Sequence, residues 1–131
     1  MRKKDRGFTL VEVLTVVAIM ALLFSFLVPS LFQSKKAANE AGAKTTLRNI
    51  AAALETYSLT NGVYPNTTTS LLGDSPPYLN KDYFSGVLEG YVYSATLNPG
   101  YYTVMALPIT SGIPMSTFTI TTGSVLSEQA P

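Results

Sequence analysis

Length, composition and charge restrict the chemistry that is open to this chain. It has 131 residues, with 9 Lys and Arg, 8 Asp and Glu, and neither His nor Cys, which excludes Ser-His and Cys-His dyads, disulfides, and imidazole or thiolate metal ligands. Without these groups, and with no convincing pair of carboxylates, we expect no enzyme. Residues 63–131 carry one base, Lys81, against four acids, so we expect no nucleic-acid partner.

A long apolar segment follows a short basic leader. Residues 8–32 would form a helix of about 37 Å, enough to cross a hydrocarbon layer of about 30 Å. Four bases precede the segment and only Lys35 and Lys36 follow it closely, which predicts a cytoplasmic N-terminus. A secretory signal peptide, an ordinary single-pass anchor and a buried helix of a soluble domain remain alternatives. The absence of a small-residue cleavage site after Val28 disfavours the signal peptide.

Glu12 is the one charged residue inside this apolar segment. An ionised carboxylate in hydrocarbon costs several kcal/mol unless it is paired. No basic residue lies within one or two helical turns after Gly7, and Arg6 is six residues away. We therefore expect Glu12 to have a partner outside its own helix. The alternative is a carboxylate that simply reaches the membrane interface near the helix start.

Residues 7–12, with the sequence GFTLVE, resemble the processing signal of type IV prepilins and type II secretion pseudopilins, which lies between a basic leader and an apolar helix. The resemblance implies that a membrane-embedded prepilin peptidase cleaves the Gly7–Phe8 bond and methylates the new N-terminus of Phe8. It also implies that Glu12 pairs with the Phe8 ammonium of a neighbouring subunit during assembly. Pro29 lies where many of these proteins carry a proline.

The helical pattern continues beyond the apolar segment. One apolar stripe with three- and four-residue steps consists of Ala43, Leu47, Ile50, Ala51, Leu54 and Tyr57. Glu40 and Lys44 are spaced for an ion pair. The Asn61-Gly62 dipeptide is typical of a helix C-terminus. We therefore predict a helix from about Thr9 to Leu59, with a bend or break at Pro29.

Short strands are expected in the C-terminal part of the chain. Alternating or β-rich sequences predict strands at 90–97, 101–107, 116–121 and 125–126, with turn residues between them. Three or four such strands form an antiparallel sheet with one face on the helix. The predicted fold class is α+β, with a long hydrophobic N-terminal helix whose second half packs on a small sheet. This is also the arrangement that the resemblance to pilins implies.

The connection between helix and sheet contains several aromatic residues and prolines. Tyr64, Tyr78 and Phe84 either cover the open end of the core or form subunit contacts, as the equivalent loop does in pilins. Major type II pseudopilins bind calcium in an acidic C-terminal loop. Here, the 41 residues after Gly90 contain Glu128 as their only acid. We therefore expect no calcium site, and no metal or other cofactor.

These observations divide the chain into a cleaved leader (1–7), a transmembrane or filament-core helix (8–32) and a periplasmic or extracellular head (33–131). Within the head we expect an amphipathic helix (33–60), a connecting loop (61–89) and an antiparallel sheet (90–131).

The function implied first is a structural subunit of a type IV pilus-like filament, inserted in the inner membrane before assembly. The alternative is a pseudopilin of a type II secretion system, in a periplasmic pseudopilus. The expected partners are further copies of the chain, the prepilin peptidase, an inner-membrane platform, a cytoplasmic assembly ATPase, minor pilins and the membrane. A tip subunit for DNA uptake or adhesion, and an anchored periplasmic enzyme, are weaker alternatives.

Overall fold

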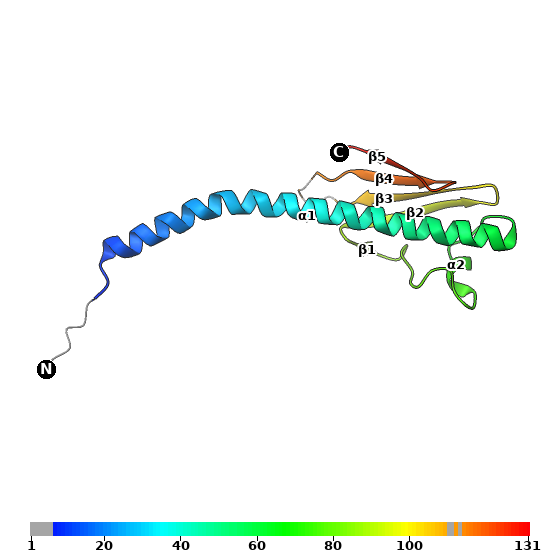
Figure 1. Cartoon of the computed structure of the whole chain (residues 1–131), viewed down its shortest axis with the longest axis horizontal. Helices are drawn as coiled ribbons and strands as arrows, with labels where there is room; N and C mark the ends of the chain where they lie inside the picture. Colours follow the sequence, from blue (N-terminus) through cyan, green and yellow to red (C-terminus); the bar gives the residue numbers. More distant parts are fainter. Residues whose placement is uncertain (1–6, 110–111, 113) are drawn as a thin grey trace. The chain divides into compact units, whose positions relative to one another are not determined.

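The computed structural model describes residues 7–109, 112 and 114–131 (Figure 1). The chain divides into two compact units, Met1–Lys35 and Lys36–Pro131, called here the N-terminal unit and the head. The elements are α1 (Leu10–Asn61), α2 (Ser70–Gly73), β1 (Val87–Leu88), β2 (Tyr91–Asn98), β3 (Tyr101–Pro108), β4 (Thr117–Thr121) and β5 (Val125–Gln129). A long helix followed by an antiparallel sheet confirms the predicted α+β fold class.

Helix α1 continues through Pro29 without interruption, so the break considered from the sequence is absent. A proline cannot donate to the carbonyl four residues earlier, here that of Ser25. Apolar helical residues on both sides keep the remaining backbone bonds. Single prolines are tolerated in apolar helices because local adjustments satisfy the carbonyl that the proline leaves free.

The C-terminus of α1 is fixed by glycine. Gly62 has φ +78°, and its N–H donates to the carbonyl of Ser58 over 2.8 Å. A residue without Cβ adopts this left-handed conformation without steric cost, which makes glycine the usual residue just past a helix end. The helix therefore ends at Asn61, two residues beyond the predicted Leu59.

The sheet of the head is an antiparallel meander in the order β1-β2-β3-β4-β5. The four predicted strands are present, close to their expected positions. The two-residue strand β1 was not predicted; it pairs with the start of β2 through Val87 and Leu88. Glu89 (φ +57°) and Gly90 (φ +79°) form the tight turn between these strands, as a two-residue hairpin loop with both central residues left-handed.

The core of the head lies between α1 and one face of the sheet. Alternate residues of β2, β3 and β4 are buried, as expected for strands with one face on a core. From the predicted stripe of α1, Ala43, Leu47, Ile50, Ala51 and Leu54 are fully buried, and Tyr57 packs against the cluster as a partly buried side chain. The largest buried side chains are Tyr91, Tyr93, Tyr102 and Phe118.

The connection between α1 and the sheet is structured and covers the edge of this core. Leu71 of α2 is fully buried, and its carbonyl accepts a hydrogen bond from the N–H of Leu79 at 3.0 Å. Tyr78 meets the ring of Tyr57 edge-on, with ring centroids 5.2 Å apart. Tyr64, Tyr78 and Phe84 all pack against the core, which supports a covering role for each of them.

Candidate processing and assembly site

Gly7 and Phe8 lie ahead of the first helical residue, in a segment with no regular secondary structure. The side chain of Phe8 is 82% exposed. A Cβ placed on Gly7 would meet no atom of the described residues within 4 Å. Within residues 7–35, both residues of the predicted cleavage bond are therefore exposed.

Glu12 has a partner on its own helix. Its Oε2 accepts hydrogen bonds from the backbone N–H of Thr9 at 2.8 Å and from the Thr9 hydroxyl at 2.7 Å. In return the Glu12 N–H donates to Oγ1 of Thr9 at 3.3 Å. Thr9 is the N-cap and Glu12 the third helical residue, so the pair forms a capping box, which satisfies donors that a helix start leaves free.

Glu12 therefore has hydrogen-bond partners at the start of its own helix, whereas the partner expected from outside the helix is an opposite charge. The capping box was missed in the sequence, although Thr-x-x-Glu ahead of an apolar run is its pattern. The structure contains no ion pair for Glu12 among the described residues. Pairing with the Phe8 ammonium of another subunit remains a prediction.

The N-terminal unit presents an apolar helix with no cover. Every residue from 7 to 35 is exposed, and α1 includes a stretch long and apolar enough to cross a membrane. Two of its hydroxyl groups make local hydrogen bonds: the Thr15 hydroxyl donates to the carbonyl of Val11 at 2.8 Å, and that of Ser34 donates to the carbonyl of Ser30 at 3.0 Å. Such bonds leave fewer free donors when lipid or another apolar helix covers the surface.

Glu55, near the C-terminal end of α1, joins three other segments of the head. Its carboxylate accepts hydrogen bonds from the hydroxyls of Tyr64 and Tyr102 and from the N–H of Gly123, each at 2.9 Å. These groups come from the connection after α1, from β3 and from the turn before β5. Burial, together with the adjacent Glu55 carboxylate, raises the pKa of Tyr102 to about 12. The neutral phenol is thus the form that fits this site.

A groove of about 980 Å³ lies in the head between α1 and the connection. Small and polar residues of α1, such as Asn49 and Thr56, form one wall, and the segment from Asp74 to Asn80 forms the other. Asp74 is the only titratable carboxyl group in its lining. Among the described residues there is also no group of three or more acids that could hold a metal ion.

An exposed apolar helix that starts in a capping box and continues into a small antiparallel head defines a pilin-like class of protein. Residues 2–28 match the prokaryotic N-terminal methylation motif, and residues 30–105 match the family described as type II secretion system (T2SS), protein G. The second match covers more than half of the chain, and the chain belongs to this protein G family.

Several curated relatives are named type II secretion system core protein G. The relative from Escherichia coli K12 is 35% identical over 100 residues, 73% of this chain and 67% of the relative. The relative from Vibrio cholerae is 44% identical over 69 residues, 53% of this chain and 47% of the relative. The one from Pseudomonas aeruginosa is 39% identical over 70 residues, 53% of this chain and 49% of the relative. Against these last two, the chain spans about half of the relative's length.

These names favour the second of the two functions inferred from the sequence. The basic leader, the glycine and the apolar helix are shared by type IV pilins and pseudopilins, so they do not separate the two. The protein G match extends beyond the anchor, through most of the head to β3. It therefore places the chain with a secretion-system pseudopilin family, and the type IV pilus interpretation has less support.

Proposed function

We propose that this protein is a structural subunit of a periplasmic pseudopilus that serves a type II secretion system. The protein G match over residues 30–105 is the observation that carries this proposal. The role is mechanical and requires no catalysis by this chain. Before assembly, the subunit spans the inner membrane once as a precursor with its N-terminus in the cytoplasm. Its head lies in the periplasm, where the subunits assemble.

Processing precedes assembly in this proposal. A prepilin peptidase cleaves between Gly7 and Phe8 and methylates Phe8, and the leader 1–7 is lost. The exposed, irregular backbone at this bond supports such access, because a protease must bind an extended segment. Residues 8–32 then move from the lipid into the filament core, and residues 33–131 form the outer surface. Pro29 leaves one carbonyl without a donor in this core helix.

The partners follow from the same proposal. Further copies of the chain form the filament, with minor pseudopilins among them. This sequence has no phosphate-binding loop, so the energy for moving the subunit out of the membrane must come from other proteins. A cytoplasmic ATPase and an inner-membrane platform supply it. The type IV pilus remains the competing destination for the same processed subunit.

The test is the intact mass of the protein in two fractions of producing cells, inner membrane and sheared surface filaments. A species that begins at methylated Phe8 and stays with the cell envelope supports the pseudopilus. The same species in sheared filaments supports a type IV pilus and contradicts the proposal. A chain that keeps residues 1–7 in both fractions contradicts the processing step.

A substitution of Gly7 tests whether the peptidase recognises this bond. Among the described residues, a Cβ at this position meets nothing within 4 Å, so we expect Gly7→Val to cause no steric clash there. We expect the variant to insert in the membrane and to keep its leader. If Gly7→Val is cleaved as efficiently as the natural chain, the bond after residue 7 is not the one that the peptidase recognises.

A further inference from the structure

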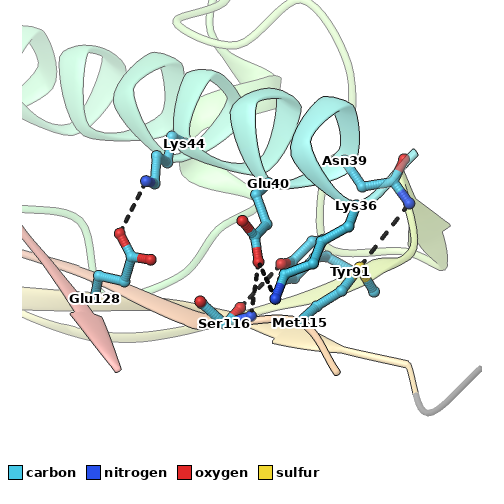
Figure 2. Close-up of polar contacts among 8 residues, drawn as sticks. All are labelled: Lys36, Asn39, Glu40, Lys44, Tyr91, Met115, Ser116 and Glu128. Carbon is cyan, nitrogen blue, oxygen red and sulfur yellow. Dashed lines mark hydrogen bonds and ion pairs between the residues drawn. The ribbon is translucent and has the colours of Figure 1, made fainter. Parts of the chain in front are cut away.

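Ser116, the residue just before β4, is hydrogen-bonded by one side chain from α1 and one from β2 (Figure 2). Ser116 is 5% exposed. Its N–H donates to Oε1 of Glu40, on α1, at 3.0 Å, and its carbonyl accepts a hydrogen bond from the hydroxyl of Tyr91, on β2, at 2.9 Å. The connection from β3 therefore ends at a residue whose two backbone groups are both fixed by side chains.

Lysines of α1 flank both carboxylates in this region. Nζ of Lys36 lies 3.8 Å from Oε1 of Glu40. Nζ of Lys44 lies 2.9 Å from Oε2 of Glu128, on β5, and 4.7 Å from the centre of the Phe118 ring. The hydrogen bond from Lys44 lowers the pKa of Glu128. Both ammonium groups thus face carboxylates at the contact between α1 and the sheet, as Figure 2 shows.

The pairing differs from the one that the sequence predicts. Glu40 and Lys44 have the spacing of an ion pair on one helix, but the two described pairs are Lys36–Glu40 and Lys44–Glu128. Residues 36, 40 and 44 lie on one row of α1, four residues apart. Glu40 contacts Lys36 within this row and the Ser116 N–H ahead of β4, and Lys44 contacts Glu128 on β5. The row is therefore linked to the sheet through Glu40 and Lys44.

The chain does not fit the calcium site that resemblance to major pseudopilins implies. Calcium takes six to eight oxygen ligands, usually with several carboxylates among them. The connection 109–116 contains no Asp, Glu, Asn or Gln. The nearby carboxylates of Glu40 and Glu128 already face ammonium groups, which would repel a divalent cation.

We propose that Lys36 and Lys44 take the place of a divalent cation in this head. With Glu40, Glu128 and the backbone of Ser116 they form what we call the lysine clamp, which holds the start of β4 and strand β5 on α1. The positive charge that a bound ion would supply is part of the chain. The head consequently folds and stays folded at any concentration of calcium.

The first experiment is thermal unfolding of the full chain in detergent micelles, followed by circular dichroism, with excess EDTA or with millimolar calcium. We expect the same Tm in both solutions. Glu40→Ala leaves the Ser116 N–H buried without an acceptor, and we expect the Tm to fall by about 4–8 °C. Glu40→Gln keeps an acceptor oxygen but loses the attraction to Lys36, so its Tm falls less.

A local readout separates the clamp from general destabilisation. Hydrogen exchange of the Ser116 amide reports directly on its bond to Glu40. We expect this amide to exchange at least tenfold faster in Glu40→Ala and near the natural rate in Glu40→Gln. Asp74→Ala is the matched control, because the Asp74 side chain is exposed and has no bond among the described residues.

Three results would overturn the proposal. The first is a rise in the Tm of the natural chain when calcium is added. The second is a Glu40→Ala variant whose Tm and Ser116 exchange rate match those of the natural chain. The third is calcium binding by the natural chain that is lost in the Glu40→Ala variant, which would make Glu40 an ion ligand. None of these results bears on the pseudopilus proposal, which the mass measurement tests separately.

Discussion

At the scale of single residues, Glu55 joins parts of the head that are distant in sequence. It accepts hydrogen bonds from Tyr64, Tyr102 and Gly123. Bonds to a charged acceptor each contribute about 1.5–3 kcal/mol, but this group is only partly buried and exchanges them against water. We expect Glu55→Ala to lower the free energy of unfolding by about 2–3 kcal/mol, measured by urea unfolding of the full chain in micelles.

The matched variant is Tyr64→Phe, which removes one of the three donors and keeps the ring that meets Tyr102 edge-on, with centroids 5.1 Å apart. We expect it to cost about 1 kcal/mol. If Glu55→Ala and Tyr64→Phe have equal effects, the bonds to Tyr102 and Gly123 contribute nothing, and Glu55 does not hold the three segments together.

Two buried tyrosines predict how the head responds to alkali. Burial raises the pKa of Tyr91 and of Tyr102 to about 12, against an ordinary value of 10.0. Above pH 10 the unfolded chain loses these protons before the folded chain does, so the free energy of unfolding falls as pH rises from 10 towards 12. Below pH 10 this contribution is complete and constant.

Each of these tyrosines adds up to about 1.4 kcal/mol per pH unit to that slope. We expect Tyr91→Phe to reduce the slope between pH 10 and pH 12, as measured by urea unfolding at a series of pH values. Tyr101→Phe is the control, since Tyr101 lies on β3 with a side chain 53% exposed. A slope that is the same in all three proteins contradicts the effect of burial.

At the scale of elements, Gly42 weakens α1 where the helix meets the β1–β2 turn. A Cβ at Gly42 would meet the carboxylate of Glu89. That carboxylate is the end of a flexible, exposed side chain, so it can move aside. Alanine is favoured over glycine inside a helix by about 1 kcal/mol. We therefore expect Gly42→Ala to raise the free energy of unfolding by about 0.5–1 kcal/mol.

The double variant Gly42→Ala with Glu89→Ala measures what moving the carboxylate costs. We expect it to recover the full gain of about 1 kcal/mol over Glu89→Ala alone. A Gly42→Ala variant that is less stable than the natural chain in the same urea experiment would mean that Glu89 is held in place, and that the glycine is needed for close packing.

Elements with a local sequence signal were predictable, and contacts between distant residues were not. Asn61-Gly62 indicated the end of α1, and turn residues separated the strands β2 to β5. Strand β1 has only two residues and forms because β2 offers a free edge, so no periodicity could reveal it. The bond from Ser116 to Glu40 joins residues 76 positions apart. Such partners are decided by packing rather than by local spacing.

At the scale of the whole molecule, Glu12 has two separate roles, one within its own chain and one in the proposed filament. The residue caps α1 through Thr9 within one chain, and in the proposed filament it also meets the Phe8 ammonium of a neighbour. The variant Glu12→Gln separates these roles, because glutamine serves equally well in a capping box but carries no charge. Glu12→Ala loses both the cap and the charge.

We expect Glu12→Gln to insert in the membrane, to be processed, and to fail in assembly. Removing one member of a buried ion pair costs about 3–5 kcal/mol, because the other charge stays buried alone, and a polymer meets this cost at every subunit. The measurement is the yield of crosslinked multimers in the membrane fraction, with intact mass to verify processing. If Glu12→Gln forms multimers normally and Glu12→Ala does not, the cap is the essential feature and the pairing with Phe8 is wrong. Loss of assembly in both variants, with normal processing, instead identifies the charge of Glu12 as the feature that the filament needs.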